Sequence, residues 1–359
     1  MNGAVGADVA AVLFCLALIV GSAWLGTRGW LARAVSVCAV VVGAALLVAG
    51  VMALLPGDPI EGILGEEAAP ADKQALGQAL GLLDEAGNPL GALATTGRFL
   101  RGAVTMGVVV VAPGAWALAT LPPEPRSHRS QRPVREIIIE RLPRTIGLAL
   151  AAVALALLVA VPLGTLAAAK RGGPEAAFVQ GLTLVFGSVP RFAVAPVLIL
   201  AFAIGWRALP AGGADDGWRS WVLPTVTLAL PLTAFLTRLV RMGVLEALSA
   251  DFVRTARAKG RSTFWVVVRH ALPNALLPLV HAVGLQVGAL FGGAVVVEKV
   301  YSWPGLGLLL VESIRRVDVP VVQGIVLFAA ASVALSGLLA DVVAGILDPR
   351  TRRRDGAAP

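Results

Sequence analysis

Charged residues are scarce in this chain. Asp, Glu, Lys and Arg make up 14% of its 359 residues, whereas a soluble domain carries about a quarter. The hydrophobic share is 57% and the mean hydropathy is +0.82. A soluble protein of this length would need a polar surface around one or two large cores. Too few polar residues are present to form that surface, so the composition excludes a typical soluble protein and predicts lipid as the solvent.

Cysteine is nearly absent too. Cys15 and Cys38 both lie in apolar runs, where small buried hydrophobes are the expected interpretation. They therefore indicate neither a disulfide framework nor a redox compartment. His270 and His281 are separated by about three helical turns and lack further ligands, so no metal site is expected.

The apolar residues gather into runs of the length that a membrane span needs, about 20 residues. An eighth run, 102–121, is ambiguous, and the acidic connection 56–101 contains "APADKQALGQALGLL", which favours a soluble helix. The seven strong candidate spans are 8–26, 35–55, 145–169, 178–206, 221–240, 276–298 and 321–346.

Basic residues in the short loops predict the orientation. If the loop 241–275 is cytoplasmic, most loop Lys and Arg residues fall inside the cell, including the arginines after residue 349. The short outer loops, 207–220 and 299–320, hold fewer. No Lys or Arg precedes the 8–26 run, so an uncleaved span is favoured there over a signal peptide.

The loop 241–275 concentrates charge, including Arg254, Arg257, Lys259, Arg261 and Arg269. Each charge at the bilayer centre costs about 2.5–3.5 kcal/mol on insertion scales, so this segment must lie outside the hydrocarbon. Its composition predicts two short helices, with Gly260 as a stop and Ser262 as a new N-cap. Leu248, Phe252 and Thr255 or Ala256 are expected to share one face.

The order of residues in "DFVRTARAKGRSTFWVVVRHALPN", 251–274, resembles the loop motif of permease subunits of dipeptide and oligopeptide ABC importers, whose relatives also carry nickel and glutathione. That motif is written E-A-A, three residues, G, nine residues, I-x-L-P. Aligned on Gly260, the motif begins at Arg254, Thr255 and Ala256, and ends at His270, Leu272 and Pro273. Other segments are similar to the family in the same order, namely "LLPGDP", "SVPRFAVAPVLILAF", "EKVYSWPGLGLLLVESI" and "LADVVAGILDPR".

The resemblance implies an all-α polytopic membrane protein with the type I ABC importer permease fold, located in a bacterial inner membrane. Six core spans and an extra N-terminal span are expected. The expected parts are an extra span and cytoplasmic loop (1–34), the first core span with an extracytoplasmic helical segment and apolar insert (35–144), the core permease domain (145–346) and a basic cytoplasmic tail (347–359).

The apolar insert at 104–125 departs from the family pattern. Both of its flanks lie outside in the family, and one crossing would place them on opposite sides. Pro113 and Gly114 at its middle favour a bent, re-entrant or surface-packed segment. Seven spans with the N-terminus outside are therefore favoured over eight.

The resemblance also implies the division of labour. A second homologous permease, two ATPase subunits and an extracytoplasmic solute-binding protein are the expected partners. The chain has no G-x-x-x-x-G-K-[ST] phosphate loop, so the partners would use the ATP and the chain itself would bind no cofactor. The expected coupling residues are Asp251, Arg254, Thr255, Ala256, Arg257, Lys259, Gly260, Leu272 and Pro273.

Two residues near the spans are candidates for the translocation pathway, Arg191 and Gln286. Arg191 has two interpretations of similar weight, a pathway residue or a structural pair. For the basic residues of the loop, binding to anionic lipid headgroups is the alternative to coupling. A self-contained secondary carrier and a membrane-anchored nucleic-acid protein are the competing functions; the loop motif argues against the first, and the lack of a soluble basic domain against the second.

Overall fold

The structure is a computed structural model that describes residues 43, 69–79, 83, 125–260 and 262–347. The expected spans at 8–26 and 35–55, the apolar insert at 104–125 and the basic tail at 347–359 lie outside these residues, apart from positions 43, 125 and 347. The predictions made for those segments therefore remain predictions.

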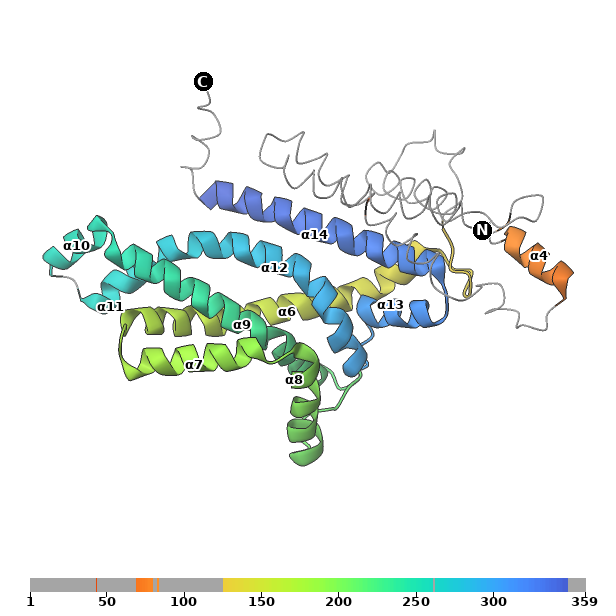
Figure 1. Cartoon of the computed structure of the whole chain (residues 1–359), viewed down its shortest axis with the longest axis horizontal. Coiled ribbons are helices and arrows are strands. Elements are labelled where there is room, and N and C mark those ends of the chain that lie inside the picture. The colour runs from red at the N-terminus through yellow and green to blue at the C-terminus, as the bar shows by residue number, and fades with distance from the viewer. Residues whose placement is uncertain (1–42, 44–68, 80–82, 84–124, 261, 348–359) are drawn as a thin grey trace, which may run out of the picture. The chain divides into compact units, whose positions relative to one another are not determined.

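All regular secondary-structure elements among the described residues are helices (Figure 1). An isolated β-bridge joins Arg126 and Pro133, and no strand occurs among the described residues. The predicted all-α class is confirmed, as is a helix within 69–83. The elements are α4 Pro70–Ala79, α6 Val134–Ala169, α7 Pro174–Ser188, α8 Arg191–Leu198, η2 Ile199–Gly205, α9 Trp218–Ser249, α10 Asp251–Ala258, α11 Thr263–Val266, η3 Val267–Ala271, α12 Leu272–Val300, α13 Leu306–Arg315 and α14 Val319–Leu347.

Three described helices are long and apolar enough to cross a membrane, and two bent helix pairs bring the number to as many as five. The three are Val134–Ala169, Trp218–Ser249 and Val319–Gly337; the pairs are Pro174–Ser188 with Arg191–Gly205, and Phe264–Leu276 with Pro278–Leu290. Each contains or overlaps one of the five spans predicted after residue 144.

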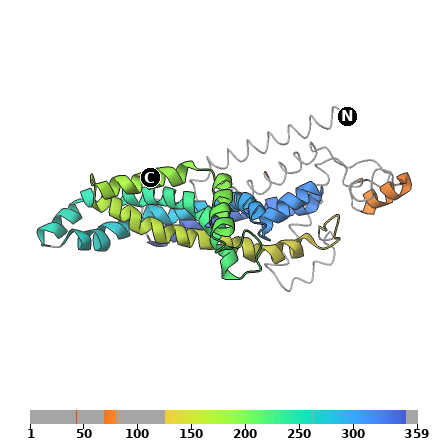
Figure 2. The same cartoon turned by 90° about the horizontal axis from the view of Figure 1, so that it is seen from below.

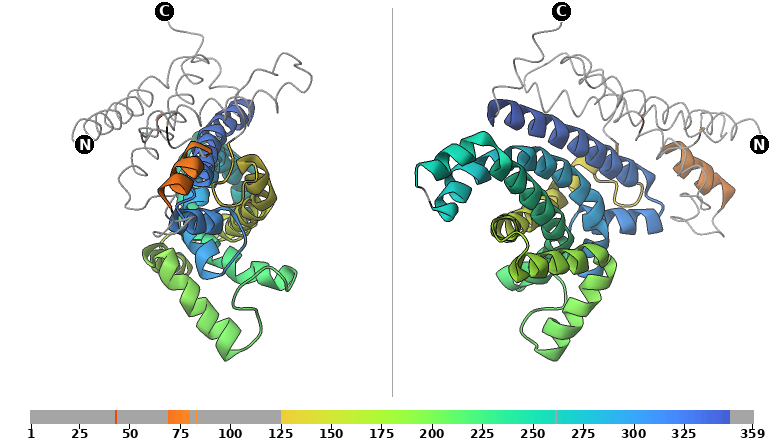
Figure 3. Two further views of the ribbon diagram at one scale, coloured as in Figure 1. Left: turned by 90° about the vertical axis from the view of Figure 1, so that its right-hand side faces the viewer. Right: turned by 60° about the vertical axis from the view of Figure 1, so that its left-hand side comes forward.

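The span expected at 178–206 is broken rather than continuous. Its two halves, α7 and α8, meet at an angle of 100°, and Figures 1 and 3 show α8 turning away from the direction of α7. Pro190 disfavours a helical conformation at the preceding residue, and Val189 is extended with φ −82° and ψ 123°. Pro196 then removes one backbone donor inside α8, and a π-helical stretch, η2, follows.

The chain divides into two compact units, residues 1–142 with 309–334, and residues 143–308 with 335–359. In the first unit, Asp318 accepts hydrogen bonds from the Ser127 hydroxyl and the His128 backbone N–H. These contacts attach the loop before α6 to the turn before α14.

The second unit holds the main core, which is built from buried Ala, Val and Leu side chains. Alanine is frequent at these positions, among them Ala152, Ala195 and Ala294, and small residues let helix backbones approach closely inside a membrane. Figure 2 shows α6, α7, α9 and α12 running along one another in this unit.

Candidate coupling and translocation site

The charged loop forms a helical corner at one end of the α9–α12 pair. Helix α9 stops at Ser249, Ala250 is extended, and α10 begins at Asp251. Gly260 follows α10 with φ +74°, a conformation that glycine adopts without the strain a side chain brings. Both short helices and the stop at Gly260 are confirmed. Ser262 caps α11 as predicted, because its hydroxyl accepts the Trp265 N–H at 3.3 Å.

The corner has a small core of its own. Val253 and Val266 are fully buried, Ala256 is buried, and Leu248 packs against them. The expected apolar face is confirmed at Leu248 and at Ala256, whereas Phe252 and Thr255, the alternative to Ala256, are exposed. The extended residue Ala250, with ψ 152°, interrupts the helix between Leu248 and Phe252 and so resets the register of the apolar face.

This small core continues directly into a transmembrane helix. Val266 belongs to the core of the corner, whereas its neighbour Val267 belongs to the main core of the spans. Between α11 and α12 the chain stays helical through the π-helical segment η3, and Ala271 at its end is also buried in the main core. The two cores therefore meet at Val266 and Val267 within one continuous helical stretch.

The predicted coupling residues occupy two places. Asp251 and Arg254 form an ion pair at 3.7 Å with side chains 96% and 82% exposed, which contributes little to stability. Lys259 and Gly260 are exposed beside them, and Ala256 is buried beneath. The side chain of Arg257 lies outside the described set.

Leu272 and Pro273 lie away from α10, at the start of α12. Leu272 packs against the main core, and Pro273 follows it in the same continuous helical stretch, directly after the π-helical segment η3. One part of the motif thus lies in the exposed corner and the other at the start of α12.

Large apolar side chains are exposed around the corner, which charge-based reasoning did not anticipate. Phe264 is 78% exposed, Phe252 44% and Val268 43%. Exposed apolar groups beside charged residues are typical of a surface that another protein covers. The signal was present in the sequence as "TFWVVV", 263–268, read only as part of a helix.

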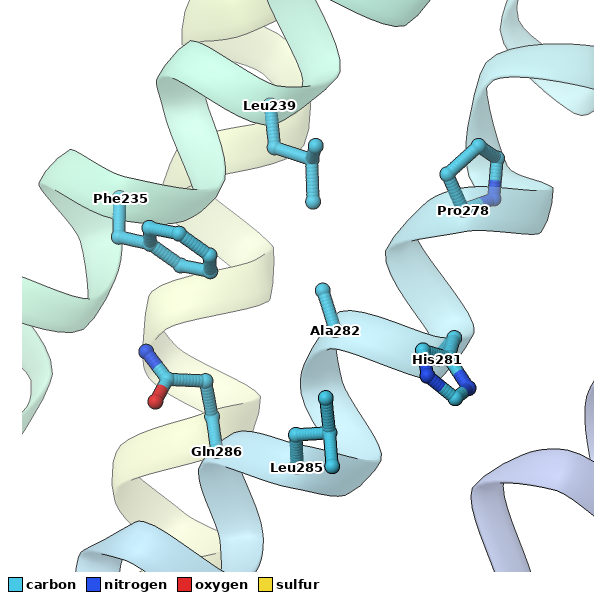
Figure 4. Close-up of a pocket in the computed structure, with 7 residues that line it drawn as sticks. All are labelled: Phe235, Leu239, Pro278, His281, Ala282, Leu285 and Gln286. Atoms are coloured by element: carbon cyan, nitrogen blue, oxygen red, sulfur yellow. The ribbon is translucent and has the colours of Figure 1, made fainter. Parts of the chain in front are cut away.

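A cavity of about 330 Å³ lies between α9 and α12. In Figure 4, Gln286 extends from α12 toward Phe235 on α9, whereas His281 projects from another side of α12. Gln286, a predicted pathway residue, therefore lines a cavity. The lining is formed by Phe235, Leu239, Pro278, His281, Ala282, Leu285 and Gln286.

Arg191, the other predicted pathway residue, is the first residue of α8 and lies at the 100° bend. It is half-buried, and no described carboxylate forms an ion pair with it. It does not line the cavity that contains Gln286. The structure therefore does not bring the two candidates together in one cavity, and the pathway role of Arg191 stays a prediction.

The opposite end of α12 is held by a buried carboxylate to which no role was predicted from sequence. Glu298 is fully buried. One of its oxygens accepts the Thr145 hydroxyl at 2.8 Å, and the other accepts the N–H groups of Gly307 and Leu308 at 2.6 and 3.0 Å. The carboxylate therefore caps the start of α13. It also ties α6 to α12.

Two aromatic side chains complete this end. The Tyr301 hydroxyl lies 2.9 Å from that of Thr227 and donates to the carbonyl of Ala195 at 3.3 Å. Trp303 is fully buried and packs edge-on against Trp221 at 4.7 Å. Glu298, Tyr301 and Trp303, with their partners, are called the outer anchor below. The turn "SWPGLG" is thus a packed junction of several helices.

A bundle of apolar helices, an exposed helical corner packed onto a span and a fixed opposite end define a class of protein, the membrane-embedded permease subunit of a multi-subunit transporter. Residues 160–353 match the family described as binding-protein-dependent transport system inner membrane component, and the chain belongs to this family. It is accordingly a permease subunit of an ABC importer in the inner membrane.

Two relatives illustrate the similarity. The glutathione transport system permease protein GsiC of Escherichia coli (strain K12) is 35% identical over 299 residues, which cover 83% of this chain and 90% of the relative. The dipeptide transport system permease protein DppB of Escherichia coli (strain K12) is 36% identical over 258 residues, covering 64% and 76%.

A chain of the MetNI methionine ABC transporter in an inward-facing conformation is structurally similar, with a TM-score of 0.53 and 18% identity. The match covers 60% of this chain and 99% of that one. At this identity the likeness shows the fold, which confirms the type I permease architecture that the resemblance implied.

Proposed function

We propose that this chain forms one half of the translocation pathway of an importer for peptides or glutathione, and that α10 and α11 couple it to separate ATPase subunits. The observation that carries the coupling assignment is the exposed corner whose own core leads through Val266 and Val267 into α12. The partners proposed are a second homologous permease, two ATPase subunits and an extracytoplasmic solute-binding protein. ATP is used by the ATPase subunits, and this chain acts as a transport subunit rather than an enzyme.

The corner offers two kinds of contact to an ATPase groove. Phe252 and Phe264 present apolar surface, and Arg254 presents a positive charge. Burying the two rings would supply most of the contact energy, because apolar burial contributes about 25 cal/mol per Å². The arginine would select an acidic partner and fix the orientation.

The substrate assignment rests on the relatives, which are named for glutathione and dipeptides. Glutathione is itself a short peptide, so both fall into one chemical class. The cavity beside Gln286 is lined mainly by apolar side chains, and a pathway that carries diverse short peptides needs such a lining without a tight polar site. Nickel import by the same architecture is the alternative.

Copurification tests the coupling assignment. Wild type, Gly260→Asp and Arg254→Glu are expressed with the ATPase subunits, and Arg315→Glu serves as the control because its exposed side chain belongs to the outer helix α13. Both loop variants should lose at least tenfold in recovered ATPase, and the control should lose none. Equal recovery for all four chains would refute the assignment.

Uptake by reconstituted vesicles tests the substrate and the energy source. Labelled dipeptide, glutathione and nickel are offered with the binding protein, with and without ATP. ATP-dependent uptake of a peptide or of glutathione is expected. Uptake of nickel alone would support the alternative, and uptake driven by an ion gradient without ATP would identify a secondary carrier.

A further inference from the structure

A second cavity, of about 210 Å³, lies between α7 and α9. Two arginines one helical turn apart on α9, Arg238 and Arg241, line it together with Thr237. From α7 it receives the polar residues Gln180 and Thr183. Neither arginine belongs to the loop motif, and no function has been assigned to this pocket above.

Gln180 and Thr183 bond to backbone carbonyls of α7, but two polar groups contributed by α9 lack partners within the described chain. Nε of Arg241 and the hydroxyl of Thr237 are buried without a hydrogen bond. Among the described carboxylates, none forms an ion pair with Arg238 or Arg241. Buried polar atoms are almost always hydrogen-bonded, so Nε of Arg241 and the Thr237 hydroxyl are open to a partner from outside the described chain. The exposed Arg238 adds a second positive charge at the rim, which favours an anion as that partner.

The position of the cavity along α9 indicates which anion. Helix α9 has 32 residues, a length of about 48 Å at 1.5 Å per residue, so it is longer than the hydrocarbon core of about 30 Å. If the core begins near Trp221, beside the aromatic residues of the outer interface, it ends near Val240. Arg241 then lies at the level of the lipid headgroups on the side of α10, the cytoplasmic side, and Arg238 lies one helical turn before it at the edge of the core.

The remaining lining is apolar and open to the surroundings. Leu184 is 61% exposed and Met242 57% exposed, and both border the cavity beside the arginines. A soluble anion needs only the polar half of such a site. A phospholipid uses both halves, because its phosphate meets the guanidinium groups and its acyl chains cover the apolar rim.

We propose that the cleft between α7 and α9 binds the phosphate of an anionic phospholipid of the cytoplasmic leaflet, held by Arg238 and Arg241. The guanidinium groups form charge-assisted hydrogen bonds with the phosphate oxygens. The Thr237 hydroxyl lines the same cavity, beside the position for the glycerol or headgroup hydroxyls. The bound lipid would support the packing of α7 against α9 close to the coupling corner.

Native mass spectrometry of the importer, purified with its partners from mixed phosphatidylglycerol and phosphatidylcholine nanodiscs, tests this site. The variants are the double substitution Arg238→Gln with Arg241→Gln, and the same pair changed to Lys. Arg219→Gln is the control, since Arg219 is an exposed arginine at the outer end of the same helix.

The wild type and the control should retain phosphatidylglycerol in preference to phosphatidylcholine. The glutamine pair should retain about 25-fold less, since each basic residue at an anionic surface contributes about fivefold in binding. The lysine pair keeps both positive charges and should retain most of the phosphatidylglycerol. Comparison of the two pairs distinguishes loss of the charged site from misfolding.

Equal phosphatidylglycerol retention by all variants would overturn the proposal. If millimolar inorganic phosphate displaced the lipid, the ligand of this site would be free phosphate rather than a phospholipid, and the proposal would be wrong. The glutamine pair could instead retain its lipid but lose an ATPase or permease partner. That result would show that the cleft is a protein interface, and it would also overturn the proposal. None of these readouts depends on peptide transport, so the proposed function can fail or stand independently.

Discussion

At the outer end of α12, Glu298 is fully buried and accepts three hydrogen bonds from groups of the same chain. At the other end, α10 rests on a core of a few small side chains, and its ion pair between Asp251 and Arg254 is almost fully solvated. The Glu298 carboxylate of the outer anchor finds its hydrogen-bond partners within the described chain. The corner instead exposes its phenylalanine rings and charged side chains.

This contrast suggests a division of mechanical roles. One end of α12 is fixed by the outer anchor, and the other end leads through the π-helical segment η3 to the helical corner. The path bends by 47° between Leu276 and Pro278. π-Helical turns are frequent at functional sites. The outer anchor should therefore determine stability, and the corner should determine coupling. The predictions below test that separation, from the largest expected effect to the smallest.

Substitution of Glu298 by Ala should give the largest loss of stability. It leaves two backbone N–H groups and the Thr145 hydroxyl buried without an acceptor, and each such group costs about 1–3 kcal/mol. We expect the thermal unfolding midpoint of the purified permease to fall strongly, with Glu298→Gln intermediate because an amide oxygen still accepts. Glu246→Ala, at an exposed position of α9, is the control. A midpoint equal to that of the control would contradict the outer anchor.

Substitution of Gly305 by Ala should also destabilise the outer end. A Cβ at this position would overlap the Glu298 carboxylate, and overpacking of this kind costs about 1–3 kcal/mol. Gly181→Ala in α7 is the matched control, because a Cβ there meets nothing within 4 Å and alanine favours a helix. In the same unfolding assay, we expect Gly305→Ala to lower the midpoint and Gly181→Ala not to lower it. An equal shift in both would mean that the carboxylate moves aside freely.

Two valines provide the most direct comparison of the ends. Val297 near the outer anchor and Val253 in α10 are both fully buried, so Val→Ala removes the same atoms from each, about 1–2 kcal/mol of apolar burial. We expect Val297→Ala to lower the unfolding midpoint with coupling retained. Val253→Ala should lower the midpoint less, because Val253 belongs to the small separate core of the corner rather than to the main core, and it should reduce ATP-dependent uptake severalfold. The reverse pattern would contradict the division of roles.

The smallest effect concerns pH and the loop attached by Asp318. Burial lowers the pKa of His128 below its usual value of 6.5, and this exceeds the opposite influence of Asp318. His128 therefore binds a proton less readily when the loop is attached than when the loop is open. The stability of the attachment is present above about pH 6.5 and is lost as the pH falls toward the lowered pKa.

Hydrogen exchange at residues 127–131, corrected for the intrinsic effect of pH, measures this opening. Protection should fall by less than about tenfold between pH 7.5 and 5.5 in the wild type, and the change should disappear in His128→Gln. Protection that rises on acidification would show that Asp318 dominates instead.

Much of the transmembrane arrangement could be predicted from the sequence, because apolar run length reports directly on the bilayer. The five spans after residue 144, the break at Gly260 and the Ser262 cap were all readable. The 100° bend at Pro190 was not, since a hydropathy window averages over the turn. The burial of Val253 in place of Phe252 was also missed, because one extended residue, Ala250, changes the register.

The outer anchor escaped prediction for a different reason. Glu298 appears at the end of an apolar run, where a carboxylate is normally solvated, and its partners Thr145 and Gly307 are far from it or across a turn. Long-range hydrogen bonds leave no local pattern. The same holds for Arg238 and Arg241, which resemble ordinary interfacial residues until α7 is placed beside them.

The central claim, that the exposed corner docks on an ATPase subunit, is tested most directly by photocrosslinking. A photoreactive amino acid is placed at Phe252 in the assembled importer, and at Arg315 on α13 as the control. We predict a crosslink from position 252 to an ATPase subunit that weakens or shifts when ATP is added, and no such product from position 315. Crosslinking of position 252 to lipid alone, with or without ATP, would contradict the account.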